Sequence, residues 1–290
     1  MSSVTESYHK KTTNLDLLSI DEILSVMIEE DRTLPIAIEK IKNDIHNCVQ
    51  LMVNSIRAGG KIIYIGAGTS GRLGVLDAVE CVPTFSSPPS LFQGFIAGGR
   101  DAMFSSAEGA EDNPKFGIDI VEKHAVKQDV VIGIASSGIT PFVFGGLDQA
   151  KAIGAKTALI TCNKFEKKAE YDVIIELIVG PEILSGSTRL KSGTATKMVL
   201  NMLSTTTMVQ LGKVYKNLMV DLKITNQKLY RRAVRIFCEI CKSNESTAKL
   251  YLKKSTMNLK IAIVMKMENL SCEDAAFALE RANGNLRGVL

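Results

Sequence analysis

Hydrophobic residues recur at helical spacing through the first sixty residues. Ser19 and Glu22 form a capping box ahead of a predicted helix, and the polar residues 1–16 precede it as an arm. A second apolar stripe starts near Thr33 and stops at Gly59, a common kind of helix end. We therefore expect two N-terminal helices, the second of which runs unbroken to this glycine.

The hydrophobic period changes after residue 60. Short runs rich in Val and Ile alternate with helical segments, which is typical of a parallel sheet covered by helices on both faces. Strands are expected at residues 61–65, 95–97, 129–135, 156–161 and 173–178. Helices are expected between them and after them, at residues 70–79, 116–125, 141–153 and 196–211.

From residue 226 onward the pattern predicts only short helices, one of them capped by Ser271. The predicted fold class is α/β: a doubly wound, mostly parallel sheet with N-terminal helices and a small C-terminal helical domain. The expected parts are an arm with helices, an α/β domain that binds the ligand and a small helical domain, over residues 1–55, 56–220 and 221–290.

Composition narrows the class of protein. The 290 residues are 46% hydrophobic and 23% charged, as in an ordinary globular protein. A net charge of +4 is too small to indicate nucleic-acid binding, and no apolar run approaches the ~20 residues that span a bilayer. The first residues lack the apolar core of a signal peptide, so we expect a cytoplasmic protein with no nucleic-acid or membrane partner.

The cysteines and histidines do not indicate a catalytic or metal site. The six cysteines are expected to be reduced, and the pair Cys238 and Cys241 lies in a helical pattern without the second pair that a zinc site needs. His9 lies in the arm, and His46 and His124 lie in helical segments away from the glycine-rich loops. Neither a catalytic triad nor a metal site is predicted.

The first glycine-rich loop, Gly66-Ala-Gly-Thr-Ser-Gly-Arg72, follows a strand and opens a helix. A helix N-terminus offers unpaired backbone N–H groups and partial positive charge, so this loop predicts an anion site with Gly68, Thr69 and Ser70 as ligands. The spacing also fits a dinucleotide fingerprint, but the stretch about 20 residues on lacks the acidic residue that would bind a ribose. A sugar phosphate is therefore favoured over NAD.

Two further loops repeat this arrangement. One follows a later strand and contributes Ser136, Ser137, Gly138 and Thr140. The third, over residues 185–194, adds hydroxyls and cations, from which Ser187 and Lys191 are candidate ligands. Because the carboxyl ends of parallel strands share one edge of a sheet, we expect these loops to form one crevice.

Three glutamates are candidates for acid–base chemistry. Glu80 lies near the C-terminal end of the helix that the first loop opens, where the helix dipole disfavours an anion. Glu108 and Glu111 form an acidic cluster in a loop after Gly98-Gly99. Two carboxylates beside a bound sugar are suited to general acid and general base roles.

Five motifs lie in order along the chain: the stretch from Gly66 to Thr84, Ile96-Ala-Gly-Gly99, Ala107-Glu-Gly-Ala-Glu-Asp112, Gly186-Ser-Thr-Arg-Leu-Lys-Ser-Gly-Thr-Ala195 and Leu200-Asn-Met-Leu-Ser204. Together they resemble the N-acetylmuramic acid 6-phosphate etherase family. The resemblance implies a sugar isomerase-type domain, a homodimer and a sugar-phosphate substrate, with no metal or organic cofactor. It also implies cleavage of the lactyl ether of N-acetylmuramic acid 6-phosphate.

The resemblance assigns roles to these residues. It implies that Glu80 assists departure of lactate and prepares the water, that Glu111 removes the C2 proton, and that Glu108 is a hydroxyl partner. Two departures from the family pattern stand out, because Ile139 occupies a position that is usually basic and Val82 one that is usually proline. Neither removes a candidate carboxylate.

Two alternatives remain open at this point. Animal glucokinase regulatory protein resembles these loops but binds fructose phosphates as a signal, in a much longer chain with two such domains. An aldose–ketose isomerase would share the C2 base without needing a leaving group at C3. The basic tail over residues 221–290 offers a surface for a protein partner, or packs within a dimer.

Overall fold

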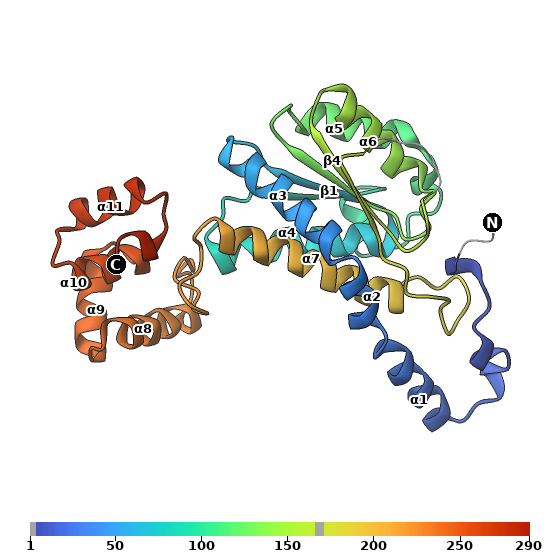
Figure 1. Cartoon of the computed structure of the whole chain (residues 1–290), viewed down its shortest axis with the longest axis horizontal. Coiled ribbons are helices and arrows are strands. Elements are labelled where there is room, and N and C mark those ends of the chain that lie inside the picture. Colours follow the sequence, from blue (N-terminus) through green and yellow to red (C-terminus); the bar gives the residue numbers. More distant parts are fainter. Residues whose placement is uncertain (1–3, 166–170) are drawn as a thin grey trace. The chain divides into compact units, whose positions relative to one another are not determined.

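A parallel five-stranded sheet forms the centre of the chain (Figure 1). The computed structural model describes residues 4–165 and 171–290. The strand order is β2-β1-β3-β4-β5, and every neighbouring pair is parallel. The strands are β1 (Ile62–Gly66), β2 (Phe92–Ile96), β3 (Val130–Ile134), β4 (Lys156–Thr161) and β5 (Val173–Glu176). The predicted α/β class and parallel sheet are confirmed.

Helices cover both faces of the sheet. α5 (Pro114–His124) and α6 (Pro141–Ala152) lie on one face, with α3 (Lys42–Arg57), α4 (Gly68–Phe85) and α7 (Lys191–Gln210) on the other (Figure 1). β1 is buried at every position because its side chains alternate between these two layers. Ile63 and Ile65 join the core beneath α6, whereas the Tyr64 hydroxyl donates to Asp77 of α4.

The N-terminal helices follow the predicted pattern with one difference. α1 (Ile20–Asp31) begins with the predicted capping box, in which Ser19 and Glu22 hold each other's backbone N–H groups. The second predicted helix is interrupted at Ile41, giving α2 (Leu34–Lys40) and α3. A tight turn replaces one regular helical turn there, since the Ile41 N–H bonds to the carbonyl of Ile38.

Both long helices of the α/β region exceed their predicted bounds. α4 continues past Val79 and through Pro83, in a stretch for which the sequence predicted a loop. Burial of Cys81 and Phe85, one turn apart, stabilises this end. α7 begins at Lys191 rather than near residue 196, because the Glu182 carboxylate accepts from the first backbone N–H groups of the helix.

The C-terminal residues form four helices around their own core, as predicted. They are α8 (Gln227–Cys241), α9 (Glu245–Lys254), α10 (Leu259–Met267) and α11 (Cys272–Arg281). Each begins with a side-chain cap, from Asn226, Asn244, Asn258 and the predicted Ser271. The buried Lys260 ammonium crosslinks this region, because it donates to the carbonyls of Gly212 and Gly284 and pairs with Asp221.

The chain divides into two compact units. The first comprises Met1–Val79 with Ser90–Ser204, and the second Glu80–Pro89 with Thr205–Leu290. The boundaries expected from the sequence, at residues 55 and 220, stay a prediction. Among the described residues, none of the helices has the length and apolar character to cross a bilayer.

Candidate functional site

The strand order reverses direction at one edge of the sheet, between β1 and β3. β1 lies between β2 and β3, and the chain leaves β1 for a helix on one face and leaves β3 for a helix on the other. The loops after these two strands therefore diverge at this point, and open α/β sheets bind ligands beside such a point. The residues predicted as anion ligands come from these two loops.

The first two loops meet between the ends of β1 and β3. The hydroxyl oxygens of Ser70 and Ser136 lie 3.3 Å apart, and the two residues are only 8% and 9% exposed. Gly68, Thr69 and Ser70 form the first turn of α4, whose backbone N–H groups have no partner within the helix. The hydroxyls and N–H donors thus gather where the helix dipole favours an anion.

The second loop supplies the start of α6. Thr140 is the N-cap of this helix and is buried, yet its side chain makes no capping hydrogen bond. Ser137 and Gly138 are half-buried beside it, and Ile139 at the tip is 71% exposed. An exposed apolar side chain stands where the related family usually has a basic one.

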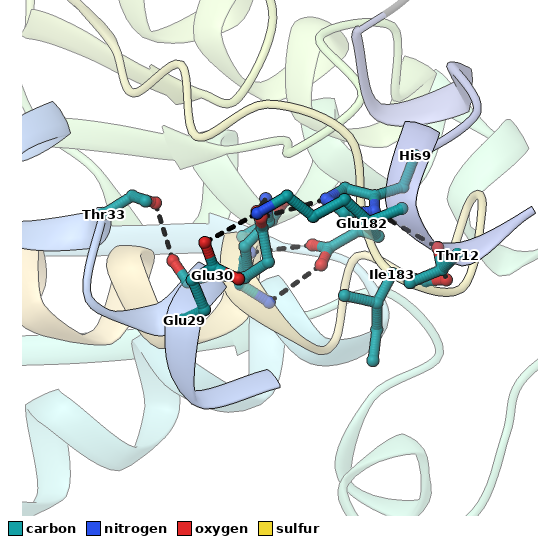
Figure 2. Close-up of polar contacts among 10 residues, drawn as sticks. His9, Thr12, Glu29, Glu30, Thr33, Glu182 and Ile183 are labelled. Carbon is teal, nitrogen blue, oxygen red and sulfur yellow. Dashed lines mark hydrogen bonds and ion pairs between the residues drawn. The ribbon is translucent and has the colours of Figure 1, made fainter. Parts of the chain in front are cut away.

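The third loop differs from the anion site that the sequence predicted. Glu182 already accepts from the backbone N–H groups of Lys191 and Ser192 at 3.0 and 2.8 Å. The Lys191 ammonium is buried against Glu30, with 2.6 Å between Nζ and Oε2 (Figure 2). Ser187 is half-buried in the turn that precedes the helix. The roles of Ser187 and Lys191 as substrate ligands stay predictions.

A pocket of about 300 Å³ joins the start of α4 to the acidic loop. Gly68 lines it together with Glu108 and Glu111, which are both exposed. The loop folds back tightly at Gly98, where φ is +85° and a Cβ would come within 2.6 Å of Ala107. The structure thus brings two of the three candidate glutamates to the first anion loop.

Arg72 fastens this acidic loop to α4. Its Nε donates to the carbonyl of Met103 at 3.2 Å, and its Nη2 donates to that of Ser105 at 2.9 Å. Arg72 also lines the pocket, one helical turn after Gly68. Sequence reasoning passed over this residue, although it closes the first glycine-rich motif.

Glu80 is the first residue of the second compact unit. It lies twelve residues after Gly68 on α4, is exposed, and is not among the residues that line the pocket described above. Its proposed catalytic role stays a prediction.

Cys162 lies directly after β4 behind the second loop. Burial raises the pKa of its thiol, so the sulfur stays protonated at neutral pH. The carbonyl of Ser136 accepts from its backbone N–H at 3.0 Å. A buried thiol of this kind supports the loop and does not act as a nucleophile.

Two family profiles match parts of the chain. Residues 44–151 match the glucokinase regulatory protein N-terminal SIS domain, and residues 216–269 match the C-terminal lid domain of glucokinase regulatory protein. Each profile covers less than half of the chain, so the family is decided by relatives that match over the full length.

A protein named N-acetylmuramic acid 6-phosphate etherase 2 from Lactiplantibacillus plantarum is 51% identical over 285 residues, covering 98% of this chain and 96% of its own. An N-acetylmuramic acid 6-phosphate etherase from Geobacillus sp. WCH70 is 51% identical over 288 residues, with 99% and 98% covered. The chain belongs to the N-acetylmuramic acid 6-phosphate etherase family. Membership confirms the resemblance that the motifs predicted.

Solved structures agree with the fold of this etherase family member. A proposed phosphosugar isomerase involved in capsule formation from Bacteroides fragilis has a TM-score of 0.51 at 18% identity, covering 69% of this chain and 95% of its own. A protein of E. coli CFT073, solved as a complex, has a TM-score of 0.50 at 17% identity, with 69% and 97% covered. At these identities the likeness concerns the fold alone.

Proposed function

We propose that this protein cleaves the D-lactyl ether of N-acetylmuramic acid 6-phosphate, in the breakdown or recycling of cell-wall amino sugars. The products are N-acetylglucosamine 6-phosphate and D-lactate. The observation that carries this proposal is the 51% sequence identity to two N-acetylmuramic acid 6-phosphate etherases over almost the entire chain. A regulatory role, as in glucokinase regulatory protein, is less favoured, because the relatives that match from end to end are enzymes.

The phosphate of the substrate binds in the crevice between the first two loops. Its oxygens accept from the N-terminal N–H groups of α4 and from hydroxyls around the crevice. The ligands in this proposal are Gly68, Thr69, Ser70, Ser136, Ser137, Gly138 and Thr140, with Ser187 and Lys191 of the third loop. The pairing of Ser70 with Ser136 supports a single phosphate site built from both loops.

The chemistry is an elimination followed by addition of water. The sugar ring opens, the C1 aldehyde acidifies C2, and Glu111 takes the C2 proton. The bond from C3 to the ether oxygen breaks as Glu80 protonates the departing lactate. Water then adds across the double bond: Glu80 accepts its proton, the hydroxide joins C3, and Glu111 returns a proton to C2. Glu108 binds a sugar hydroxyl.

We further propose that the enzyme acts as a homodimer. Glu111 is exposed at the edge of its pocket, and Glu80 is exposed in the other compact unit. General acids and bases work best where water is restricted, so a second subunit that covers both carboxylates fits this chemistry. We place the enzyme in the cytoplasm, since its six free cysteines suit a reducing compartment.

Release of D-lactate tests the proposed function. Purified protein given N-acetylmuramic acid 6-phosphate, without added metal or NAD, should release D-lactate. Glu80→Ala should abolish release and leave thermal unfolding unchanged, because it removes the acid that protonates the leaving group.

Glu122→Ala, at an exposed site on α5, is the matched control and should keep full activity. Undiminished turnover in Glu80→Ala would remove this residue from the mechanism. Tight fructose-phosphate binding with no lactate released by the wild type would instead support the regulatory function.

A further inference from the structure

Asn163 binds the backbone of the second loop through its side-chain amide. It lies two residues beyond β4, at the carboxyl edge of the sheet, and is only 6% exposed. Its side-chain Nδ2 donates to the carbonyl of Ser136 at 3.0 Å and to that of Ser137 at 3.1 Å. One amide therefore holds two successive carbonyls of the loop.

The N-terminal arm fixes the direction of this amide. Asn163 Oδ1 accepts from the backbone N–H groups of Val4 at 2.6 Å and Thr5 at 3.3 Å. Its Nδ2 also donates to Thr5 Oγ1 at 3.0 Å. Because the arm supplies donors to the oxygen, the nitrogen must face the loop, and a flipped amide would place N–H against N–H.

This orientation has a consequence for the peptide between Ser136 and Ser137. In a planar trans peptide the N–H points opposite to the C=O. The Ser136 carbonyl accepts from the Asn163 amide and from the Cys162 N–H, so the Ser137 N–H points away from both. Gly138 completes the turn with φ of +73°, and its N–H bonds to the carbonyl of Ala135.

The arm is tied to the rest of its unit at several other points. The Gly186 N–H donates to the carbonyl of Thr5, and Thr12 Oγ1 donates to the carbonyl of Ile183. His9 Nε2 lies 3.0 Å from Glu30 Oε1, on the carboxylate that also holds Lys191 (Figure 2). These contacts give the arm a defined path, so its hold on Asn163 is a fixed feature of the fold.

We propose that Asn163 is a positioning residue, and that it and the arm over residues 4–12 set the second loop for the phosphate of the substrate. This inference rests on the proposed function for the identity of the substrate. Asn163 does not touch the sugar. It acts by presenting the Ser137 N–H and by keeping the loop from relaxing when the site is empty.

Two substitutions separate this role from simple attachment of the arm. Asn163→Asp keeps the acceptor for Val4 and Thr5 but loses both donors to the loop, whereas Asn163→Leu loses both functions without adding charge. Positioning of the loop predicts that both variants raise KM about tenfold or more with kcat nearly unchanged, since phosphate contacts are equal in ground and transition states. Attachment alone predicts a normal KM for Asn163→Asp.

Inorganic phosphate provides a readout that does not need turnover. Its dissociation constant, measured by protection against thermal unfolding, should weaken in parallel with KM in both variants. The loss in Asn163→Asp should persist at high salt, because screening relieves charge repulsion but does not restore a donor. Asn47→Asp, exposed on α3, is the matched control and should leave both constants unchanged.

The proposal is overturned if Asn163→Asp matches the wild type in KM and in phosphate affinity, or if its loss disappears at high salt. Should Asn163→Asp fail to fold, Asn163→Leu provides the test, and a normal phosphate affinity in that variant counts against the proposal. A wild type that binds phosphate but releases no lactate would contradict the proposed function and leave the test of Asn163 intact.

Discussion

At the scale of single residues, Asp77 shows how burial changes a titration. Its carboxylate lies in the core, where it accepts from Tyr64 and Ser204 at 3.0 Å each. Burial raises its pKa to about 6, against the effect of these two hydrogen bonds and of Lys197. The folded protein therefore binds this proton more tightly than the unfolded chain, and Asp77 costs stability as pH rises from about 4 to 6.

Replacing Asp77 by Asn should remove this pH dependence. As pH rises from 4 to 7.5, the wild type should lose stability that Asp77→Asn keeps. The free energy of unfolding of Asp77→Asn relative to the wild type should therefore increase by at most about 3 kcal/mol. Urea unfolding at the two pH values measures the difference. Asp119→Asn, exposed on α5, serves as control. A constant gap between Asp77→Asn and the wild type at both pH values would contradict the shift.

The sequence predicted the residues within the glycine-rich motifs. It did not predict the residues whose side chains bind the backbone of those loops. The hydroxyls of Thr69 and Ser70 follow from a strand, a glycine-rich loop and a helix in succession. Glu182 and Asn163 have no such motif, because Glu182 acts on backbone 9 and 10 residues later and Asn163 on backbone 27 and 26 residues earlier. Asn163 was nearest to prediction, since it follows a strand at the same edge as the other loops.

At the scale of elements, the central strands were predicted more closely than the ends of α4 and α7, whereas β2 begins at Phe92, three residues before its predicted start. Val/Ile runs mark β3 and β4 within a residue, because burial on both faces requires continuous apolar sequence. Helix ends depend on tertiary partners instead. The helix predicted to end at Val79 continues through Pro83 as α4, because burial of Phe85 holds its last turn.

The start of α7 depends on one carboxylate from outside the helix. Glu182→Ala should lower the free energy of unfolding by about 2–3 kcal/mol, because it leaves two buried N–H groups of Lys191 and Ser192 without an acceptor. Glu182→Gln, which retains one oxygen acceptor, should lose less. Chemical denaturation measures both, and equal stability of Glu182→Ala and wild type would refute this account of the cap.

At the scale of the whole molecule, the two candidate catalytic glutamates belong to different compact units. If each site takes Glu111 from one subunit and Glu80 from the other, then Glu80→Ala and Glu111→Ala are each inactive alone. Mixing them by unfolding and refolding together should restore about a quarter of wild-type activity, since half of the dimers are mixed and each has one intact site. A mixture that stays inactive would assign both glutamates of a site to one chain.

The attachment of the arm to Asn163 also orders events in time. During synthesis on the ribosome, Asn163 is added 158 residues later than Thr5. At about 5–20 residues per second, the arm waits roughly 8–30 s for its partner. A segment made before the sheet is thus among the last to reach its native contacts, and support of the phosphate loop is completed only after most of the sheet has been synthesised.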